Sequence, residues 1–230
     1  MEPLLLTRQQ VRQVDRRAIQ VWGVSGLVLM ENAGRGCADR LEQLGIRGPV
    51  VICCGKGNNG GDGFVLARHL DLRGHRVRVL VWAEEEELTG DAGCNFRILR
   101  RCAVPIEIFG AKHDQARLQS HLRDAAWIVD ALLGTGAVGE PRSPIDQVIA
   151  QINSAAVPIV AIDLPSGLDC DTGRPASCTV RAAHTFTFVA AKRGFVVPGA
   201  EQFTGQVHVL DIGVPRRLID EVLAGEPSEC

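Results

Sequence analysis

A glycine-rich turn carries the residues best suited to binding a phosphate. Residues 55–63 read Gly-Lys-Gly-Asn-Asn-Gly-Gly-Asp-Gly and follow an apolar run. Gly55, Gly57 and Gly60 have the G-x-G-x-x-G spacing with which a strand-to-helix turn brings backbone amides to a phosphate. The turn also has two side-chain amides and the carboxylate of Asp62, which a plain pyrophosphate turn does not need. It lacks the Lys-Ser/Thr ending of a Walker A loop.

Two aspartates and a lysine follow other apolar runs. Asp130 precedes Ala-Leu-Leu-Gly-Thr-Gly, Asp163 precedes Leu-Pro-Ser-Gly, and Lys192 comes shortly after a third run. Ligands of open α/β sheets bind outside the carboxyl ends of the strands, so we expect these side chains in one crevice. Carboxylate, amide and hydroxyl oxygens suit a hard cation. With so few acids among neutral oxygens, a monovalent ion fits at least as well as Mg²⁺.

The elements that must position these residues alternate between strands and helices. Short apolar runs predict strands over residues 50–54, 77–81, 106–108, 127–130, 159–163, 185–189 and 207–211. A capping box predicts a helix that begins after Thr7, and helical spacing predicts helices that carry Leu27 to Leu44 and Phe64 to Leu70. A further helix is expected from about Asp91 to Arg101, and one with Ser143 as N-cap and Pro144 at its first position. This alternation indicates an α/β fold: a mostly parallel central sheet with helices on both faces, preceded by two N-terminal helices.

Length and composition narrow the class of protein. The chain has 230 residues, and we expect a single domain over 1–230, with a short helix and loose tail from about 215. A 46% hydrophobic fraction excludes a disordered chain, and a net charge of −2 disfavours a nucleic-acid-binding surface. No apolar run reaches the roughly 18 residues of a membrane span. The eight cysteines show no C-x-x-C pair, which predicts reduced thiols in a cytoplasmic protein.

Taken together, five stretches resemble the YjeF N-terminal domain family. They are Met30–Gly34, Gly55–Gly63, Asp130–Gly136, Asp163–Gly173 and Lys192–Gly194, within a match from about Thr7 to Gly213. The resemblance implies a Rossmann-like three-layer α/β/α sandwich. It also implies an NAD(P)H-hydrate epimerase, an isomerase that interconverts the R and S forms of hydrated NADH and NADPH, together called NAD(P)HX. A separate dehydratase would then restore the cofactor.

The family's site residues carry over one by one. The substrate-binding set is Asn58, Asn59, Gly60, Gly61, Asp62, Gly134, Thr135, Gly136, Ala137, Val138, Gly139, Glu140 and Asp163. A potassium ion would be held by Asn59, Asp130 and Ser166. Asp163 and Lys192 are the ionisable residues expected nearest the reacting ring carbon, as acid–base catalysts. The two N-terminal helices would offer the surface of a homodimer.

The sequence departs from the family pattern at one position, and it leaves two alternative functions open. Ala183 stands where the family commonly has an aspartate, whose carboxylate would help to orient Lys192 or the edge of the sheet; the neighbouring His184 could partly replace it. A non-catalytic binding or scaffold module is one alternative, although it would not require the whole polar set. The other is an NAD-dependent dehydrogenase, suggested by the glycine spacing and by Glu84 as a ribose-binding acid.

Overall fold

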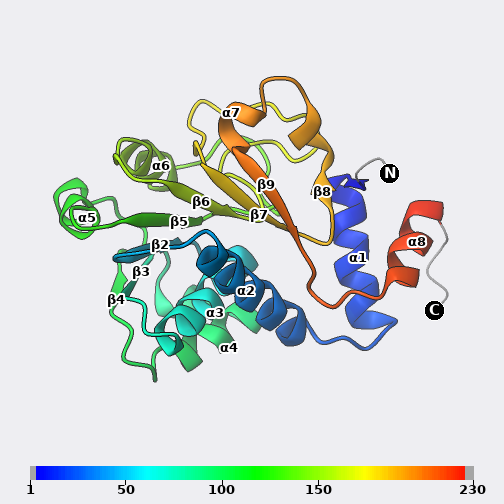
Figure 1. Ribbon diagram of the computed structural model, residues 1–230, viewed down its shortest axis with the longest axis horizontal. Helices are drawn as coiled ribbons and strands as arrows, with labels where there is room; N and C mark the ends of the chain where they lie inside the picture. Colours follow the sequence, from blue (N-terminus) through cyan, green and yellow to red (C-terminus); the bar gives the residue numbers. More distant parts are fainter. Residues whose placement is uncertain (1–3, 226–230) are drawn as a thin grey trace.

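A seven-stranded parallel sheet forms the centre of the molecule. The computed structural model describes residues 4–225 (Figure 1). The strand order is β4-β3-β2-β5-β6-β7-β9, and each neighbouring pair is parallel. The strands are β2 (Val50–Cys54), β3 (Val77–Val81), β4 (Ile106–Ile108), β5 (Trp127–Ala131), β6 (Ile159–Ile162), β7 (His184–Phe188) and β9 (Gln206–Leu210). All seven lie within two residues of the strands predicted from the sequence.

The strand order reverses between β2 and β5. From β2 the chain proceeds outward to β3 and β4, and from β5 it proceeds in the other direction to β6, β7 and β9. The segments that leave β2 and β5 at their carboxyl ends therefore diverge, which opens a crevice between them. The glycine-rich turn follows β2, and the Gly134–Gly136 loop follows β5, so this reversal places two of the predicted binding segments side by side.

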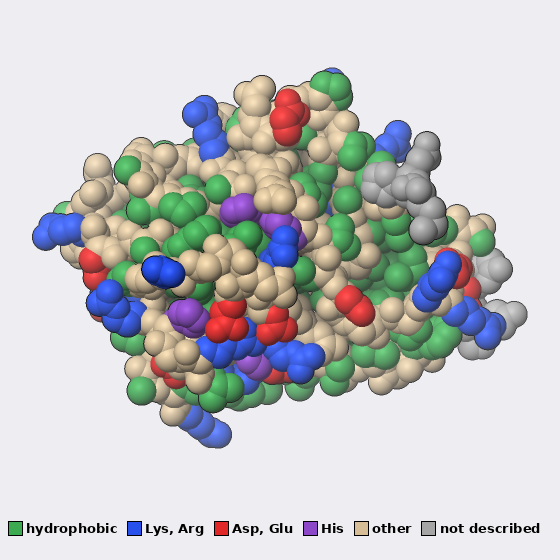
Figure 2. Space-filling model, in the orientation of Figure 1, with side chains coloured by type: hydrophobic (Ala, Val, Ile, Leu, Met, Phe, Trp, Pro, Cys, Tyr) green, Lys and Arg blue, Asp and Glu red, His purple; other side chains and the backbone are tan. Residues whose placement is uncertain are grey.

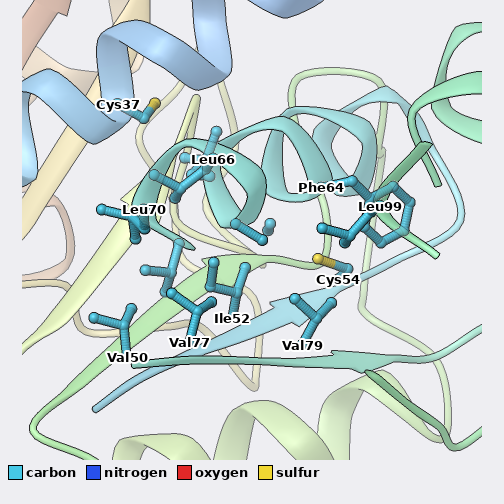
Figure 3. Packing of buried hydrophobic residues seen from close by; sticks show 14 of the residues in the cluster. Cys37, Val50, Ile52, Cys54, Phe64, Leu66, Leu70, Val77, Val79 and Leu99 are labelled. Atoms are coloured by element: carbon cyan, nitrogen blue, oxygen red, sulfur yellow. The ribbon is translucent and has the colours of Figure 1, made fainter. Parts of the chain in front are cut away.

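Helices cover both faces of the sheet. One face packs against α2 (Gly26–Gln43), α3 (Asn58–Leu72) and α4 (Gly90–Leu99), and the other against α5 (Gln115–Leu122) and α6 (Ile145–Asn153). Figure 3 shows the first of these cores, where Phe64 and Leu66 of α3 lie over Ile52 and Val79 of the sheet. All five residues of β2 are buried, as an apolar run between two helical layers requires. The three-layer α/β/α prediction is confirmed.

The first helix closes over the carboxyl edge of the sheet. Thr7 caps α1 (Arg8–Gln20) with a capping box, as predicted. The preceding strand β1 (Leu5–Leu6) pairs with β8 (Ala191–Lys192), and α1 packs on α8 (Arg216–Ala224). The two N-terminal helices therefore do not form a separate unit, because α2 belongs to the main helical layer and α1 joins the end of the chain. A short helix, α7 (Glu201–Thr204), precedes β9.

The helices differ from the sequence predictions in three places. Helix α3 begins at Asn58, so the second part of the predicted glycine-rich turn is already helical. Pro144 is the N-cap of α6 rather than its first helical residue, so the prediction of Ser143 as cap is wrong by one position. Helix α5 was not predicted, because its eight residues have few apolar side chains; Asp114 caps it through a hydrogen bond from the Arg117 amide. The predicted C-terminal helix is present, whereas the tail beyond residue 225 lies outside the described residues.

The cysteines follow the sheet pleat. Cys54 belongs to the core under α2 and α3, while Cys53 faces the α5–α6 core, so neighbouring thiols point to opposite faces. The seven cysteines in residues 4–225 are all free, which confirms reduced thiols there; Cys230 lies outside the described residues. Across the same residues, the structure has no helix that combines the length and apolar character of a bilayer span.

Two glycines of α2 provide a test of the helix packing. A Cβ built on Gly34 would lie 2.4 Å from Cβ of Val65 in α3, whereas one built on Gly36 meets nothing closer than 3.7 Å. We expect Gly34→Ala to destabilise the protein by about 1–3 kcal/mol through overpacking. Gly36→Ala should leave stability unchanged or raise it by up to about 1 kcal/mol. Urea denaturation of both variants measures this, and equal midpoints would contradict the close α2–α3 contact.

Candidate active site

A cavity of about 900 Å³ opens at the carboxyl edge of the sheet, above the reversal of strand order. Its walls come from α1, from the first turn of α3 and from the segments after β5, β6 and β7. The predicted site residues that line it are Asn58, Asn59, Asp62, all of Gly134–Glu140, Asp163 and Lys192. Four others, Gly60, Gly61, Asp130 and Ser166, lie behind the wall. Glu84, the predicted ribose-binding acid, does not line the cavity.

The glycines of the turn permit close packing of backbone on backbone. A Cβ on Gly55 would lie 2.1 Å from the carbonyl oxygen of Leu132, and one on Gly60 would lie 1.9 Å from the carbonyl oxygen of Gly55. Any larger residue at these positions would separate α3 from the ends of β2 and β5. Gly57 is the N-cap of α3 and provides no side-chain cap. The amides of this helix start are therefore available to an anionic ligand in the cavity.

Asp62 lies in the first turns of α3 and is buried. Burial raises its pKa well above the usual range, and the charges of Asp163 and Asp15 raise it further. The sequence analysis placed a negative charge here, but burial and the two neighbouring carboxylates disfavour the charged form. A neutral carboxylic acid can donate a hydrogen bond to a substrate without repelling its phosphates.

Asn59 is buried against the loop that follows β5. Neither its Oδ1 nor its Nδ2 atom has a hydrogen-bond partner within the described part of the chain. A Cβ built on Gly134 would lie 3.2 Å from Cβ of Asn59 and 3.0 Å from Oδ2 of Asp163, so the two side chains meet at this glycine. Buried amides are normally hydrogen-bonded, so an unpartnered one at a cavity wall indicates a missing ligand.

Asp130 ends β5 with no exposed surface. Its carboxylate accepts hydrogen bonds from the Ser166 hydroxyl (2.7 Å), the Ser166 amide (2.8 Å) and the Leu132 amide (3.1 Å). These neutral donors lower the pKa, but burial raises it more, to about 6. Among residues 4–225 this carboxylate has no ion pair and no group of three or more acidic, His or Cys side chains surrounds it. Oxygens of Asn59, Asp130 and Ser166 thus fit a cation of low charge better than Zn²⁺.

Lys192 and Asp163 form an ion pair at the cavity wall. Nζ of Lys192 lies 3.2 Å from Oδ1 of Asp163, and the lysine side chain has no exposed surface. Nζ also donates to the carbonyl oxygens of Phe188 (3.1 Å) and Ala190 (3.4 Å). The other carboxylate oxygen, Oδ2, accepts a hydrogen bond from the Thr135 amide at 2.9 Å. The pair therefore joins β8 to the ends of β6 and β7 and to the loop after β5.

Strained backbone at two strand ends makes this ion pair possible. Asp163 after β6 has φ +65° and Val189 after β7 has φ +68°; within residues 4–225 they are the two non-glycine residues with positive φ. Each is the centre of a three-residue turn, closed by the bonds Leu164 N to Ile162 O and Ala190 N to Phe188 O, both 2.7 Å. Such conformations cost about 1–3 kcal/mol each and cluster at functional sites.

The loop after β5 is fixed by a residue that the sequence analysis did not single out. Arg8 at the start of α1 donates from Nη1 to the carbonyl oxygens of Thr135 and Ala137, and from Nη2 to Asp169 at 3.0 Å. With those carbonyls turned toward Arg8, the loop can present amides to the cavity, as in an anion-binding nest. The position of Arg8 directly after the Thr7 cap gave no sign of this role, because the loop carbonyls that it binds lie more than 120 residues away in the sequence.

A second unpredicted residue is Asp15 of α1, which lines the cavity. It interrupts the helical stripe of Val11, Val14 and Ala18, an acidic side chain among apolar ones. That interruption was the signal that could have identified it, since a charged residue on the inward face of a helix needs a reason.

Ala183 and His184 lie at the opposite edge of the sheet. Ala183 donates its amide to the carbonyl of Ile159, the first residue of β6, while Lys192 follows the carboxyl end of β7. His184 stacks on Trp127 and hydrogen-bonds to His208 (3.2 Å). Neither position can orient Lys192, so the predicted link between this departure from the family pattern and the lysine is wrong.

The charged side chains on the face shown in Figure 2 are of both signs and interspersed, with no extended basic patch. The acidic run after β3 is exposed, and Glu87 pairs with Lys56 at the mouth of the cavity (3.0 Å). The pKa of Glu87 lies below its usual value, chiefly because its carboxylate accepts a hydrogen bond from the backbone amide of Glu84.

The family described as "YjeF-related protein N-terminus" matches residues 26–194. The chain belongs to this family. A Rhodopirellula baltica member is 43% identical over 95% of this chain and 90% of its own length, and one from Pirellula staleyi is 45% identical over 94% and 95%. Both are named NAD(P)H-hydrate epimerase.

Longer family members and a solved structure agree with this assignment. A Salinibacter ruber protein named "Bifunctional NAD(P)H-hydrate repair enzyme Nnr" is 39% identical over 99% of this chain but only 44% of its own length. The crystal structure of the yeast protein ynu0 superposes with a TM-score of 0.82 over 95% of this chain and 93% of that one, at 24% identity. The family fold therefore extends over almost the whole chain.

Arg8 provides a test of how the loop after β5 is held. We expect Arg8→Ala to destabilise the protein by about 1.5–3 kcal/mol, the range for a hydrogen bond to a charged group. Amide hydrogen exchange should accelerate in residues 134–140, because two of the loop carbonyls lose their donor. Arg16→Ala is the control, since Arg16 is exposed on the same helix. Unchanged exchange in the loop of the Arg8 variant would show that α1 does not fix it.

Proposed function

We propose that this protein is an NAD(P)H-hydrate epimerase, an isomerase that interconverts the R and S forms of NAD(P)HX. The observation that carries the proposal is the buried Lys192–Asp163 pair, facing a cavity large enough for a dinucleotide. The family relatives that match nearly the full chain bear this activity as their name. The uncapped start of α3 and the loop of residues 134–140 provide amides for the substrate's phosphates.

The reaction needs acid–base catalysis at one carbon. The hydrated nicotinamide carries a hydroxyl on the carbon next to the ring nitrogen, and inversion there proceeds through loss and return of water or through ring opening and closure. Asp163 is suited to accept a proton, because its carboxylate lines the cavity while Lys192 and the Thr135 amide fix its orientation. Lys192 stabilises the carboxylate, since its three hydrogens already have acceptors.

We further propose a potassium ion held by Asn59, Asp130 and Ser166. The unpartnered amide of Asn59 and the buried carboxylate of Asp130 support a cation of single charge. Such an ion would brace the starts of the segments that follow β2, β5 and β6. Asp163 and the amide start of α3 would then keep their relative positions.

We also propose a partner enzyme, an oligomeric state and a cellular compartment for this protein. A dehydratase acts on the S form of NAD(P)HX. The relatives named bifunctional repair enzymes indicate that the epimerase and dehydratase activities belong together. For this protein we propose that the dehydratase is a separate partner enzyme. A homodimer through the α1–α2 junction is supported by exposed apolar side chains there: Val21, Trp22, Leu27 and Val28. Free thiols support a reducing compartment such as the cytoplasm.

The function is tested with resolved (R)-NADHX and a dehydratase specific for the S form. We expect NADH to be recovered, by absorbance, much faster with this protein than by uncatalysed epimerisation. Asp163→Asn should lose about 10²–10⁴-fold in rate, because the base is removed. That equals about 3–5 kcal/mol of barrier. Asparagine tolerates the positive φ at this position.

The control for Asp163→Asn addresses stability. The single variant leaves the Lys192 ammonium buried without its carboxylate, which can cost about 3–5 kcal/mol. The double variant Asp163→Asn/Lys192→Met should recover stability but not activity. No acceleration by the wild-type protein would reject the proposed function, and a near-normal rate for Asp163→Asn would place the base elsewhere.

The potassium ion is tested by stability as well as activity. We expect a higher melting temperature in KCl than in choline chloride at equal ionic strength; a ligand at 100 times its Kd contributes about 2.7 kcal/mol. Asp130→Asn should abolish the difference. A crystal grown in KCl should show the ion at oxygen distances longer than those of Mg²⁺. An octahedral ion at about 2.1 Å would contradict the assignment.

A further inference from the structure

Asp15 is the one acidic residue of α1, and nothing in the fold explains its position. It sits in the middle of the helix, where aspartate is less favourable than alanine by up to about 0.7 kcal/mol. Val11 and Ile19, one turn to either side, also line the cavity, so Asp15 faces inward on this stripe. Within the described residues no hydrogen bond or ion pair holds its carboxylate. A structural role in capping or ion pairing is therefore absent.

The carboxylate interacts with the ion pair of the site. Helix α1 lies beyond the carboxyl ends of β6 and β7 (Figure 1), where β1 joins it to β8 and so to Lys192. The pKa of Asp15 is raised to about 6, first by burial against the cavity walls and then by the charge of Asp163, while Lys192 opposes the rise. Solvent still reaches the side chain, because it is exposed to the cavity. Asp15 thus lines the cavity from α1, a wall that Asp163 does not occupy.

We propose that Asp15 is a second acid–base catalyst, which exchanges a proton with the ring hydroxyl on one face of the substrate while Asp163 serves the other face. This inference rests on the proposed epimerase function. When inversion proceeds through loss and return of water, water leaves one face of the carbon and adds to the other, so a carboxylate fixed on one wall of the cavity serves one face. Two carboxylates on different walls provide a proton donor and a proton acceptor at the same time.

In this step water leaves one face of the ring carbon and adds to the other. The carboxylic acid of Asp15 gives its proton to the hydroxyl as the carbon–oxygen bond breaks, and the electron pair of that bond leaves with water. The ring nitrogen's lone pair forms a carbon–nitrogen double bond. Water then adds to the opposite face, its oxygen bonds to the same carbon, and the nitrogen regains its pair. Asp163 takes the proton that this water releases, so the pair of carboxylates holds one proton before and after.

Other ionisable groups around Asp15 do not fill this role. Arg12, one turn earlier, donates to the Gly136 carbonyl (3.4 Å), and Glu221 of α8 pairs with Arg17 on another face of α1 (2.6 Å). Asp91 lines the cavity near the start of α2. Asp62 lies on a different wall, where it is buried in the first turns of α3, and burial raises its pKa well above the usual range.

The test compares Asp15→Asn, Asp15→Glu and Asp220→Asn in the coupled assay. Asp220 is the matched control, the same change at an exposed position of α8. We expect Asp15→Asn to lower kcat by about 10²-fold or more with a much smaller change in KM, and an unchanged melting temperature. Asp15→Glu should recover part of the rate, and Asp220→Asn should match the wild type. In wild type, kcat/KM should fall above pH about 6 as Asp15 loses its proton, and this fall should disappear in Asp15→Asn.

An isotope measurement tests the step itself. In H₂¹⁸O the epimerised product should carry one solvent oxygen, because water leaves and another adds. Retention of the substrate oxygen would overturn the two-face step. A rate and pH profile for Asp15→Asn equal to wild type would overturn the role of Asp15 while leaving the epimerase function intact. Absence of wild-type activity would instead reject the proposed function, and with it this inference.

Discussion

The buried ammonium of Lys192 is the constraint on which the rest of the site depends. A charge with no exposed surface must be paired, or it destabilises the fold by several kcal/mol. Asp163 and two backbone carbonyls satisfy it, and both segments that supply them adopt positive-φ turns to do so. The strain at Asp163 and Val189 is therefore offset by the pairing of Lys192. The same pairing aims the Asp163 carboxylate at the cavity.

The reversal of strand order supplies the space around that pair. Because β2 and β5 are neighbours whose following segments diverge, the crevice lies where Gly55 and Leu132 touch backbone to backbone. Glycine at this contact keeps α3 close, so its first amides and Asn59 reach the cavity. Asp130 and Ser166 lie one layer behind, where their hydrogen bonds join the ends of β5 and β6. Substrate-facing and supporting residues thus occupy separate layers.

Helix α1 completes the site from outside the sheet. Arg8 holds the loop of residues 134–140 by its carbonyls, and Asp15 adds a carboxylate to the cavity. Both come from one helix whose capping box sets its start at Thr7, so the helix register determines which of its side chains face inward. A change in that register would disturb loop and carboxylate together. Helix α1 therefore contributes residues to the active site as well as packing contacts to the fold.

The sequence by itself determined the sheet, the glycine-rich turn and the placement of Asp130, Asp163 and Lys192 at strand ends. Continuous apolar runs identify strands buried on both faces, and parallel strands share one carboxyl edge, so residues after them converge. Tertiary structure alone decided the raised pKa of Asp62 and the roles of Arg8 and Asp15. Periodicity reports which face of an element is buried, but it does not report which distant segment covers that face. Those three side chains depend on contacts made across long stretches of the chain.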